Sequence, residues 1–213
     1  MSTTSESSEV LPLFPTFVWK SQLGEAVFRP IDEQLETVLG ELCREELARG
    51  QSWQSRHDLH VRSELAGLMH CVNQATRAVL QFLKIREQPF EVTGCWLNVS
   101  APGAAHALHN HPNNYLSGVY YMQVQAGADT INFHDPRAQT GVIRPPVIEL
   151  VAANADQAVV SVREGALLLF PAWLPHSVDA NASDRRRISA SFNIMFTAYT
   201  ETMSRPMWDP GIR

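Results

Sequence analysis

Two stretches in the first ninety residues carry apolar residues at helical spacing. The first spans 30–49, from Pro30 to the residue before Gly50, two residue types that favour the start of a helix and its end. The second spans 63–83, with Ser63 as the expected N-cap. The apolar positions are Ile31, Leu35, Val38, Leu39 and Leu42 in the first and Leu65, Leu68, Met69, Val72, Ala75, Val79 and Phe82 in the second. We therefore expect two amphipathic helices that pack against a sheet.

From Phe90 onward the pattern changes to short β-rich runs separated by Gly, Pro, Asn and Asp. The predicted strands are Glu91–Val99, Leu116–Val124, Thr130–His134, Val147–Val151, Ala158–Val162, Ala166–Phe170 and Ile188–Thr197. The aromatic and β-branched segment Phe14–Leu23 predicts a further strand at a sheet edge. This order predicts a mainly β fold, a double-stranded β-helix (jelly roll, cupin-like) with the N-terminal helices packed on one outer face.

The chain is long enough for one domain with a substantial core, since it has 213 residues and is 45% hydrophobic. We divide it into an N-terminal strand and helical elaboration (1–89), a jelly-roll metal-binding core (90–200) and an irregular C-terminal tail (201–213), within one compact domain. A net charge of -5 without a basic tail argues against nucleic-acid binding, and Arg185–Arg187 is too short a basic run to change this.

The ends and the cysteines indicate the cellular setting. The first eight residues, Met1 to Ser8, lack the basic start and apolar core of a secretory signal, and no segment approaches a membrane span. Cys43, Cys71 and Cys95 have neither close pairing nor metal-motif spacing, which fits a reducing cytosol. We expect a cytoplasmic protein without a membrane or nucleic-acid partner, with homo-oligomer formation left open.

Three histidines suggest a metal site. On an extended strand His109 and His111 would project from one face, because alternate side chains share a face. His176 follows the apolar run Ala166–Phe170 and a Pro-bounded turn, so it could complete one side of a metal centre. The remaining positions on the metal would stay open to substrate and oxygen.

The segment after His176 has one wholly polar face, made of Arg187, Ser189, Ser191 and Asn193. Two interpretations are available. The face lies in water on a surface strand, or it points into the barrel, where Arg187 pairs bidentately with a carboxylate and Ser189 donates to the same group. We favour the second interpretation, in which Arg187 holds an acidic co-substrate.

These residues resemble the 2-oxoglutarate/Fe(II)-dependent oxygenase superfamily, whose pattern is His-x-acid, a distal histidine and a basic residue about one strand further on. The chain is most similar to a bacterial family of 2-oxoglutarate/Fe(II) oxygenases, and the similarity is strongest between Trp96 and Asn193. The segments that carry it are Leu13-Phe-Pro-Thr, Ser52-Trp-Gln-Ser, Asp58-Leu-His, His109-Asn-His-Pro, Ser117-Gly-Val-Tyr-Tyr, Phe133-His-Asp-Pro-Arg, Phe170-Pro-Ala-Trp-Leu-Pro-His and Arg187-Ile-Ser-Ala-Ser-Phe-Asn.

The resemblance implies a role for each matching residue. His109 and His176 would bind Fe(II), Arg187 with Ser189 would bind the distal carboxylate of 2-oxoglutarate, and Tyr121 would add a phenol hydrogen bond. The implied activity is hydroxylation of a small-molecule or peptide substrate by molecular oxygen, coupled to decarboxylation of 2-oxoglutarate to succinate. Tyr120 and Tyr121 point to opposite faces of a strand, and parity favours Tyr121 inside.

His111 departs from the superfamily pattern, which has aspartate or glutamate at that position. Three neutral imidazoles leave an Fe(II) site with one more unit of positive charge than two imidazoles and a carboxylate. We take His111 as the third ligand, with Asp135 as the alternative. Two other functions stay open: a cupin-like three-histidine dioxygenase that does not use 2-oxoglutarate, and a non-catalytic jelly-roll module whose histidines hold a structural zinc.

The other histidines carry weaker signals. His57, His60 and His70 lie in or before a helical stretch, where a single histidine is more often a surface or core residue than a ligand. His106 and His134 lie close to the metal motifs, and a position facing the substrate or supporting the ligands is the functional alternative for them.

Overall fold

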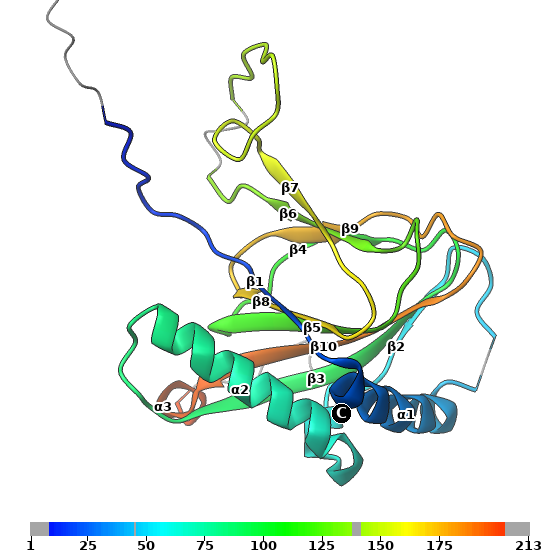
Figure 1. Cartoon of the computed structure of the whole chain (residues 1–213). Helices are drawn as coiled ribbons and strands as arrows, with labels where there is room; N and C mark the ends of the chain where they lie inside the picture. Colours follow the sequence, from blue (N-terminus) through cyan, green and yellow to red (C-terminus); the bar gives the residue numbers. More distant parts are fainter. Residues whose placement is uncertain (1–8, 45, 138–141, 203–213) are drawn as a thin grey trace, which may run out of the picture.

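The computed structural model describes residues 9–44, 46–137 and 142–202 of the chain. Two antiparallel sheets face each other, and two long helices cover the outer side of the larger sheet (Figure 1). The strands are β1 (Trp19–Gln22), β2 (Ser52–Gln54), β3 (Phe90–Ser100), β4 (His106–His109), β5 (Leu116–Gln123), β6 (Thr130–His134), β7 (Gln157–Ser161), β8 (Ala166–Pro171), β9 (His176–Val178) and β10 (Arg187–Phe196). The helices are α1 (Glu25–Leu42), α2 (Ala66–Phe82) and α3 (Thr197–Thr200), with 3₁₀ turns η1 (Leu59–Val61) and η2 (Ser63–Leu65).

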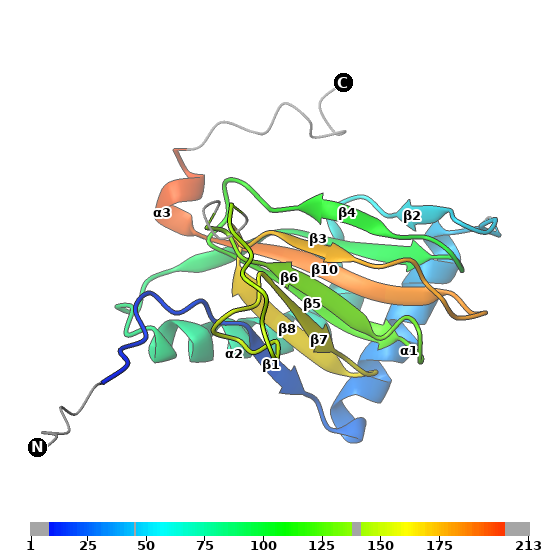
Figure 2. The same ribbon diagram turned by 90° about the horizontal axis from the view of Figure 1, so that it is seen from above.

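The larger sheet has the strand order β1-β8-β5-β10-β3-β2, and the smaller sheet has the order β4-β9-β6-β7. Seen from above, the smaller sheet lies over the larger one (Figure 2). β10 pairs with both β3 and β5, so Ser189 stands opposite Asn98 on one side and Tyr121 on the other. This two-sheet antiparallel arrangement is a double-stranded β-helix, which confirms the predicted fold class.

Two apolar layers hold these elements together, one on each side of the larger sheet. On the helix side, Ile188, Ala190 and Phe192 of β10 pack in the same cluster as Leu35 of α1 and Leu68 of α2. The residues between the sheets are mainly Val119, Tyr121, Ile131, Phe133, Leu168, Phe170 and Leu174. Because each fully buried aliphatic or aromatic side chain contributes roughly 1.5–3 kcal/mol, these layers fix the position of β10 between them.

Tyr120 lies on the helix side of β5, as parity predicted. It is 0% exposed, and its hydroxyl donates a hydrogen bond of 2.6 Å to Oδ1 of Asp32 on α1. Burial raises the pKa of Asp32 to about 6, although the hydrogen bond from Tyr120 acts in the opposite direction. This pair joins the first helix to the centre of the larger sheet.

The helices are confirmed, but their predicted ends are wrong. α1 begins at Glu25 after Gly24, so Pro30 lies inside the helix, where it removes one backbone hydrogen bond, and the helix ends at Leu42. α2 begins at Ala66 after the turn η2, so Ser63 is not its N-cap. The Ser63 hydroxyl instead contacts the Glu64 carboxylate at 3.0 Å.

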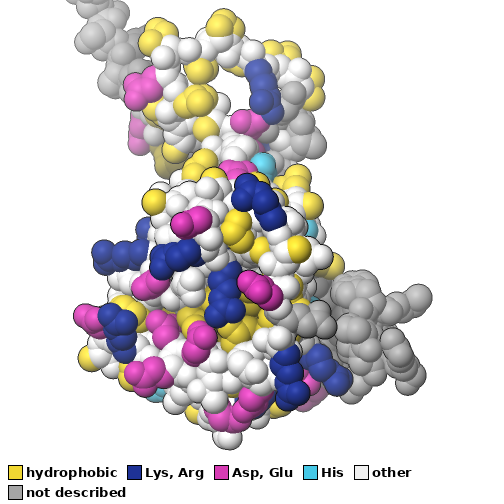
Figure 3. Space-filling model, turned by 90° about the vertical axis from the view of Figure 1, so that its right-hand side faces the viewer, with side chains coloured by type: hydrophobic (Ala, Val, Ile, Leu, Met, Phe, Trp, Pro, Cys, Tyr) yellow, Lys and Arg dark blue, Asp and Glu magenta, His cyan; other side chains and the backbone are white. Residues whose placement is uncertain are grey.

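One predicted strand is absent, since Val147–Val151 lies in the connection between β6 and β7 and forms no strand. This connection projects from the body of the protein, and hydrophobic side chains are gathered on it (Figures 1 and 3). Ile148 is fully exposed and Leu150 is 72% exposed. The apolar run was misleading because it has no neighbouring strand to pack against.

The predicted start, Met1 to Ser8, and residues 203–213 of the predicted tail lie outside the described residues. Phe14–Leu23 does supply an edge strand, but only over the four residues of β1, which pair with β8. Among the described residues, no helix is both long enough and apolar enough to cross a lipid bilayer.

Candidate metal and co-substrate site

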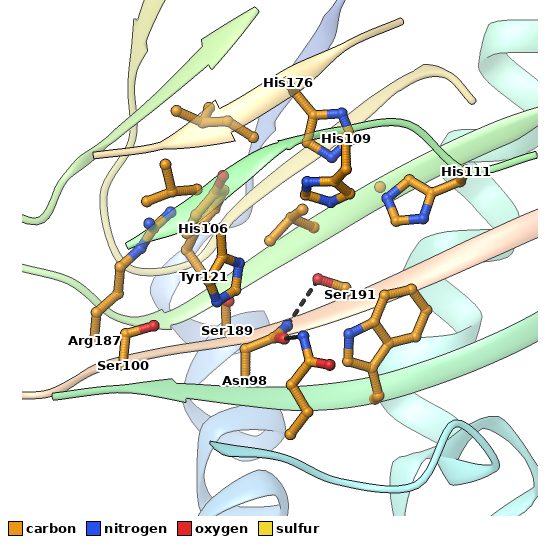
Figure 4. A pocket seen from close by; sticks show the side chains of 16 residues that line it. Asn98, Ser100, His106, His109, His111, Tyr121, His176, Arg187, Ser189 and Ser191 are labelled. Carbon is orange, nitrogen blue, oxygen red and sulfur yellow. Dashed lines mark hydrogen bonds between the residues drawn. The ribbon is translucent and has the colours of Figure 1, made fainter. Parts of the chain in front are cut away.

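A cavity lies between the two sheets. The larger sheet contributes Gln54, Trp96, Asn98, Ser100, Gly118, Val119, Tyr121, Arg187, Ser189 and Ser191. The smaller sheet contributes His106, His109, Ile131, His176 and Val178, and His111 follows directly after β4. Arg187 lies at one end and the three histidines of the predicted metal site at the other, with Tyr121, His106 and Ser189 between them (Figure 4).

The polar face of β10 points into this cavity. Arg187, Ser189 and Ser191 line it, whereas the alternate residues Ile188 and Ala190 pack toward the helices. The inward position of this face is therefore confirmed and the surface-strand interpretation is wrong, while carboxylate binding by Arg187 and Ser189 stays a prediction. The fourth residue of this face, Asn193, accepts a hydrogen bond of 2.7 Å from Ser117 beyond the cavity lining.

His109, His111 and His176 converge at the other end. Each offers a ring nitrogen, and these three atoms lie within 4.8 Å of one another. His109 and His176 are opposite residues of the paired strands β4 and β9. β4 ends at His109, so the expectation of one strand through both His109 and His111 is wrong, and the His111 amide instead donates a 2.9 Å hydrogen bond to the Ala172 carbonyl. That bond ties the third imidazole to the turn before β9.

Two of the imidazoles are oriented in the same way. Nδ1 of His109 donates to the Ala107 carbonyl at 2.8 Å, and Nδ1 of His176 donates to the Leu174 carbonyl at 3.0 Å. Because a carbonyl can only accept, Nδ1 must carry the proton and Nε2 keeps its lone pair for a metal. This backbone support is typical of histidines that bind metals.

The imidazoles of His111 and His176 are also held in the neutral form that a metal requires. Burial lowers the pKa of His111 to about 3, and the nearby rings of His176 and His109 lower it further. Burial likewise lowers the pKa of His176 to about 4, against the opposing effect of its bond to Leu174. Both side chains therefore present free lone pairs at neutral pH.

The opposite end holds polar groups without partners. Arg187 is 6% exposed and Tyr121 is 0% exposed. Nε of Arg187 and the hydroxyl of Tyr121 are buried and have no hydrogen-bond partner among the described residues. The Arg187 guanidinium carbon lies 5.3 Å from the centre of the Tyr121 ring. Since an unsatisfied buried polar group costs about 1–3 kcal/mol, both atoms are prepared for an anionic ligand that the protein itself does not supply.

Of the other candidate ligands, Asp135 and the remaining histidines, only His106 lines the cavity. Asp135 does not line the cavity, and its carboxylate forms an ion pair of 2.6 Å with Arg137. His134 is likewise outside the lining and contacts the Ser177 hydroxyl at 2.9 Å, while His57, His60 and His70 also lie outside it. His106 lines the cavity, where burial and the charge of Arg187 lower its pKa. The structure thus favours His111 over Asp135 as the third member of the cluster.

Sequence analysis missed the contribution of β3. Trp96, Asn98 and Ser100 line the cavity, whereas Leu97 and Val99 pack on the helix side. This alternation was present in the sequence and has the period of a strand with one polar face. It could have been found by applying to β3 the parity argument that was applied to β10.

Comparisons with known proteins agree with this geometry. Residues 94–193 match the sequence model of a family described as "Putative 2OG-Fe(II) oxygenase". No curated protein matches the sequence significantly.

Solved structures share the fold. The alpha ketoglutarate dependent carbocyclase SnoK from nogalamycin biosynthesis is 17% identical, with 85% of this chain and 80% of that chain covered and a TM-score of 0.62. HygX from Streptomyces hygroscopicus, with nickel and 2-oxoglutarate bound, is 14% identical, with 85% and 84% covered and a TM-score of 0.59. A prolyl-4-hydroxylase from Pseudomonas putida is 16% identical, with 85% and 93% covered and a TM-score of 0.57.

The matched segment contains most of the cavity-lining strands, the fold is the double-stranded β-helix, and the three histidines meet in one cluster. Residues 94–193 of the chain thus match a family described as 2OG-Fe(II) oxygenases, and the chain has the fold of solved 2-oxoglutarate-dependent enzymes.

Proposed function

We propose that this protein is a 2-oxoglutarate-dependent oxygenase that hydroxylates a C–H bond of its substrate, with His109, His111 and His176 holding Fe(II) and with Arg187, Ser189 and Tyr121 holding 2-oxoglutarate. The observation that carries the proposal is one cavity with three converging imidazoles at one end and, at the other, a buried guanidinium whose Nε has no hydrogen-bond partner among the described residues. A dicarboxylate of suitable length satisfies both ends at once.

The donor set suits the metal. Imidazole nitrogen binds Fe(II) well, and three ligands on one side leave positions for a chelating co-substrate and for oxygen. When bound, the iron supplies the redox chemistry that couples oxygen and 2-oxoglutarate to oxidation of the substrate. His111 in place of a carboxylate leaves this centre one unit more positive, which favours anionic ligands such as 2-oxoglutarate.

The other groups of the cavity bind the co-substrate and hold the histidines in position. Arg187 offers a fork of N–H donors that matches a carboxylate, and Ser189, two residues further along β10, adds a hydroxyl donor. Burial raises the pKa of Tyr121 to about 12, so its phenol stays protonated and donates. The ring of Phe170 packs edge-on against His176 at 4.7 Å, which limits movement of that imidazole.

A second candidate keeps the metal but not 2-oxoglutarate. His111 favours it, because three-histidine sites occur in cupin-type dioxygenases whose own substrate chelates the metal. Arg187 would then grip a carboxylate of the substrate. For either candidate, we propose that the substrate is a small molecule or a peptide. We also propose that the protein is cytoplasmic.

The test is oxygen-dependent conversion of 2-oxoglutarate to succinate by the purified, Fe(II)-loaded protein. His176→Ala should abolish iron binding and succinate formation together, whereas His70→Ala, an exposed histidine of α2, should change neither. Oxygen uptake that is independent of 2-oxoglutarate would favour the second candidate. A tightly bound zinc ion with a closed coordination shell would instead indicate a structural metal module.

A further inference from the structure

Part of the cavity floor is left over when the proposed co-substrate is placed. Arg187 lies at the end remote from the histidines, and 2-oxoglutarate would run from there past Ser189 and Tyr121 to the iron (Figure 4). The next row of the floor contains Trp96 of β3 opposite Ser191 of β10. The Trp96 ring lies 5.9 Å from that of His111, so this row lies close to the proposed iron.

Three polar side chains, Ser191 of this row and Asn98 and Gln54 of the neighbouring Ser189 row, form a chain of hydrogen bonds. Nε2 of Gln54 donates to Oδ1 of Asn98 at 2.8 Å, and Nδ2 of Asn98 donates to the Ser191 hydroxyl at 2.9 Å (Figure 4). All three residues line the cavity. Asn98 is the middle member and only 3% exposed, so it fixes the orientation of the two outer groups.

The two ends of this chain have opposite character. Because Gln54 uses its amide nitrogen on Asn98, it presents its carbonyl oxygen, an acceptor. Because Ser191 accepts from Asn98, its own hydroxyl proton is available to donate. Reversing both amides would exchange the ends but would still leave one donor and one acceptor.

A ligand that pairs with both the Gln54 carbonyl oxygen and the Ser191 hydroxyl proton needs a donor and an acceptor on different atoms. A carboxamide has this arrangement, with N–H beside C=O. A carboxylate offers only acceptors, and an ammonium offers only donors. Arg187 is the only Asp, Glu, Lys or Arg among the cavity-lining residues of the described chain, and the co-substrate would neutralise it.

We propose that Gln54, Asn98 and Ser191, beside Trp96, form the subsite for the primary substrate, and that this subsite recognises a neutral carboxamide. The proposal rests on the proposed function, since 2-oxoglutarate must occupy the Arg187 end. Gln54 and Ser191 contact the substrate, and Asn98 is a positioning residue between them. The substrate class is therefore an amide-bearing molecule, presented with a C–H bond toward the iron.

Three probes with one carbon skeleton test this: cyclohexanecarboxamide, cyclohexanecarboxylate and cyclohexylmethylammonium. Each is titrated into anaerobic protein loaded with Fe(II) and 2-oxoglutarate, and the paramagnetic broadening of its ring-proton NMR signals gives its affinity near the iron. We expect the carboxamide to bind about five- to tenfold more tightly than either charged probe, since a charged probe leaves one of these two hydrogen bonds unmade. Equal or tighter binding of the carboxylate, or no broadening by the carboxamide, would overturn the inference.

Substitutions test whether the preference for the carboxamide comes from Gln54 and Ser191. Gln54→Leu and Ser191→Ala should each weaken the carboxamide about five- to tenfold while leaving the 2-oxoglutarate affinity unchanged. Gln81→Leu, the same change on the exposed end of α2, should have no effect. Weaker 2-oxoglutarate binding in Gln54→Leu would assign the network to the co-substrate and refute the proposal. A wild-type protein that fails to form the Fe(II)–2-oxoglutarate complex would refute the proposed function instead.

Discussion

Replacement of Arg187 by leucine should weaken 2-oxoglutarate binding without lowering the stability of the ligand-free protein. The side chain is 6% exposed, and its Nε has no partner among the described residues, so the ligand-free protein carries the cost of burying this charge. Arg187→Leu removes that cost and keeps a similar apolar volume. We therefore expect the unfolding free energy without ligands to stay within about 1 kcal/mol of the wild-type value, or to rise. For a chain of this size that corresponds to a change of about 2–4 °C in melting temperature.

The same change should remove most of the 2-oxoglutarate affinity. Loss of a buried, charge-assisted pair costs about 3 kcal/mol, which is roughly a hundredfold increase in Kd. At a 2-oxoglutarate concentration of about 100 times the wild-type Kd, the ligand should stabilise the wild type by about 2.7 kcal/mol. It should stabilise the variant by only about 0.4 kcal/mol.

Thermal unfolding of the anaerobic Fe(II)-loaded protein, with and without 2-oxoglutarate, measures both effects. The melting temperature of the wild type should rise by about 5–10 °C on addition of 2-oxoglutarate, and that of Arg187→Leu by about 1 °C. Arg186→Leu is the matched control, because Arg186 is exposed and pairs with Glu36 at 3.5 Å. A variant that keeps the full ligand shift, or that loses more than about 8 °C without ligand, would refute this account of Arg187.

Three further changes have defined outcomes. Tyr121→Phe removes a buried hydroxyl without a partner, so titration should show about fivefold weaker 2-oxoglutarate binding and calorimetry no loss of ligand-free stability. Asp32 has a pKa of about 6 in the fold, so the folded state binds more protons than the unfolded state between about pH 4 and 6, and stability falls as pH rises through this range. This loss of unfolding free energy should be about 1–2 kcal/mol for a half-buried group, and Asp32→Asn should abolish it. Chemical denaturation at pH 4.5 and 7.5 measures the loss, and an unchanged pH dependence in the variant would exclude Asp32 as its source. Gly118→Ala would place a Cβ 2.3 Å from the Phe192 ring and 2.5 Å from the Leu168 carbonyl, so the unfolding free energy should drop by about 1–3 kcal/mol, whereas an unchanged value would show that the floor of the cavity can move.

The parts of the site that could be predicted from sequence lie on long strands. Polar and apolar residues of β10 alternate from Arg187 to Ile194, so the inward position of Arg187 and Ser189 followed from parity once one face was known to be apolar. β4 and β9 have four and three residues, too few for a period to emerge, and the approach of His109 to His176 depended on the resemblance and the motif order.

Other features depend on tertiary contacts that no local pattern records. The partner of Tyr120, Asp32, is 88 residues away in the sequence, and the Gln54–Asn98 bond joins two strands 44 residues apart. Val147–Val151 has the composition of a strand, but whether an apolar run becomes a strand depends on a neighbour to pair with. Pro30 suggested a helix start because proline is disfavoured in helix interiors, but it lies in the second turn of α1, whose N-cap is Gly24.

The measurement that tests the central claim most directly is an anaerobic Fe(II) titration of the purified protein, with and without 2-oxoglutarate, monitored by the weak visible charge-transfer band of the chelated complex. We predict a band that needs both components, disappears in His109→Ala and persists in His70→Ala. Iron binding without any spectral response to 2-oxoglutarate would contradict the assignment of Arg187, Ser189 and Tyr121 to that co-substrate.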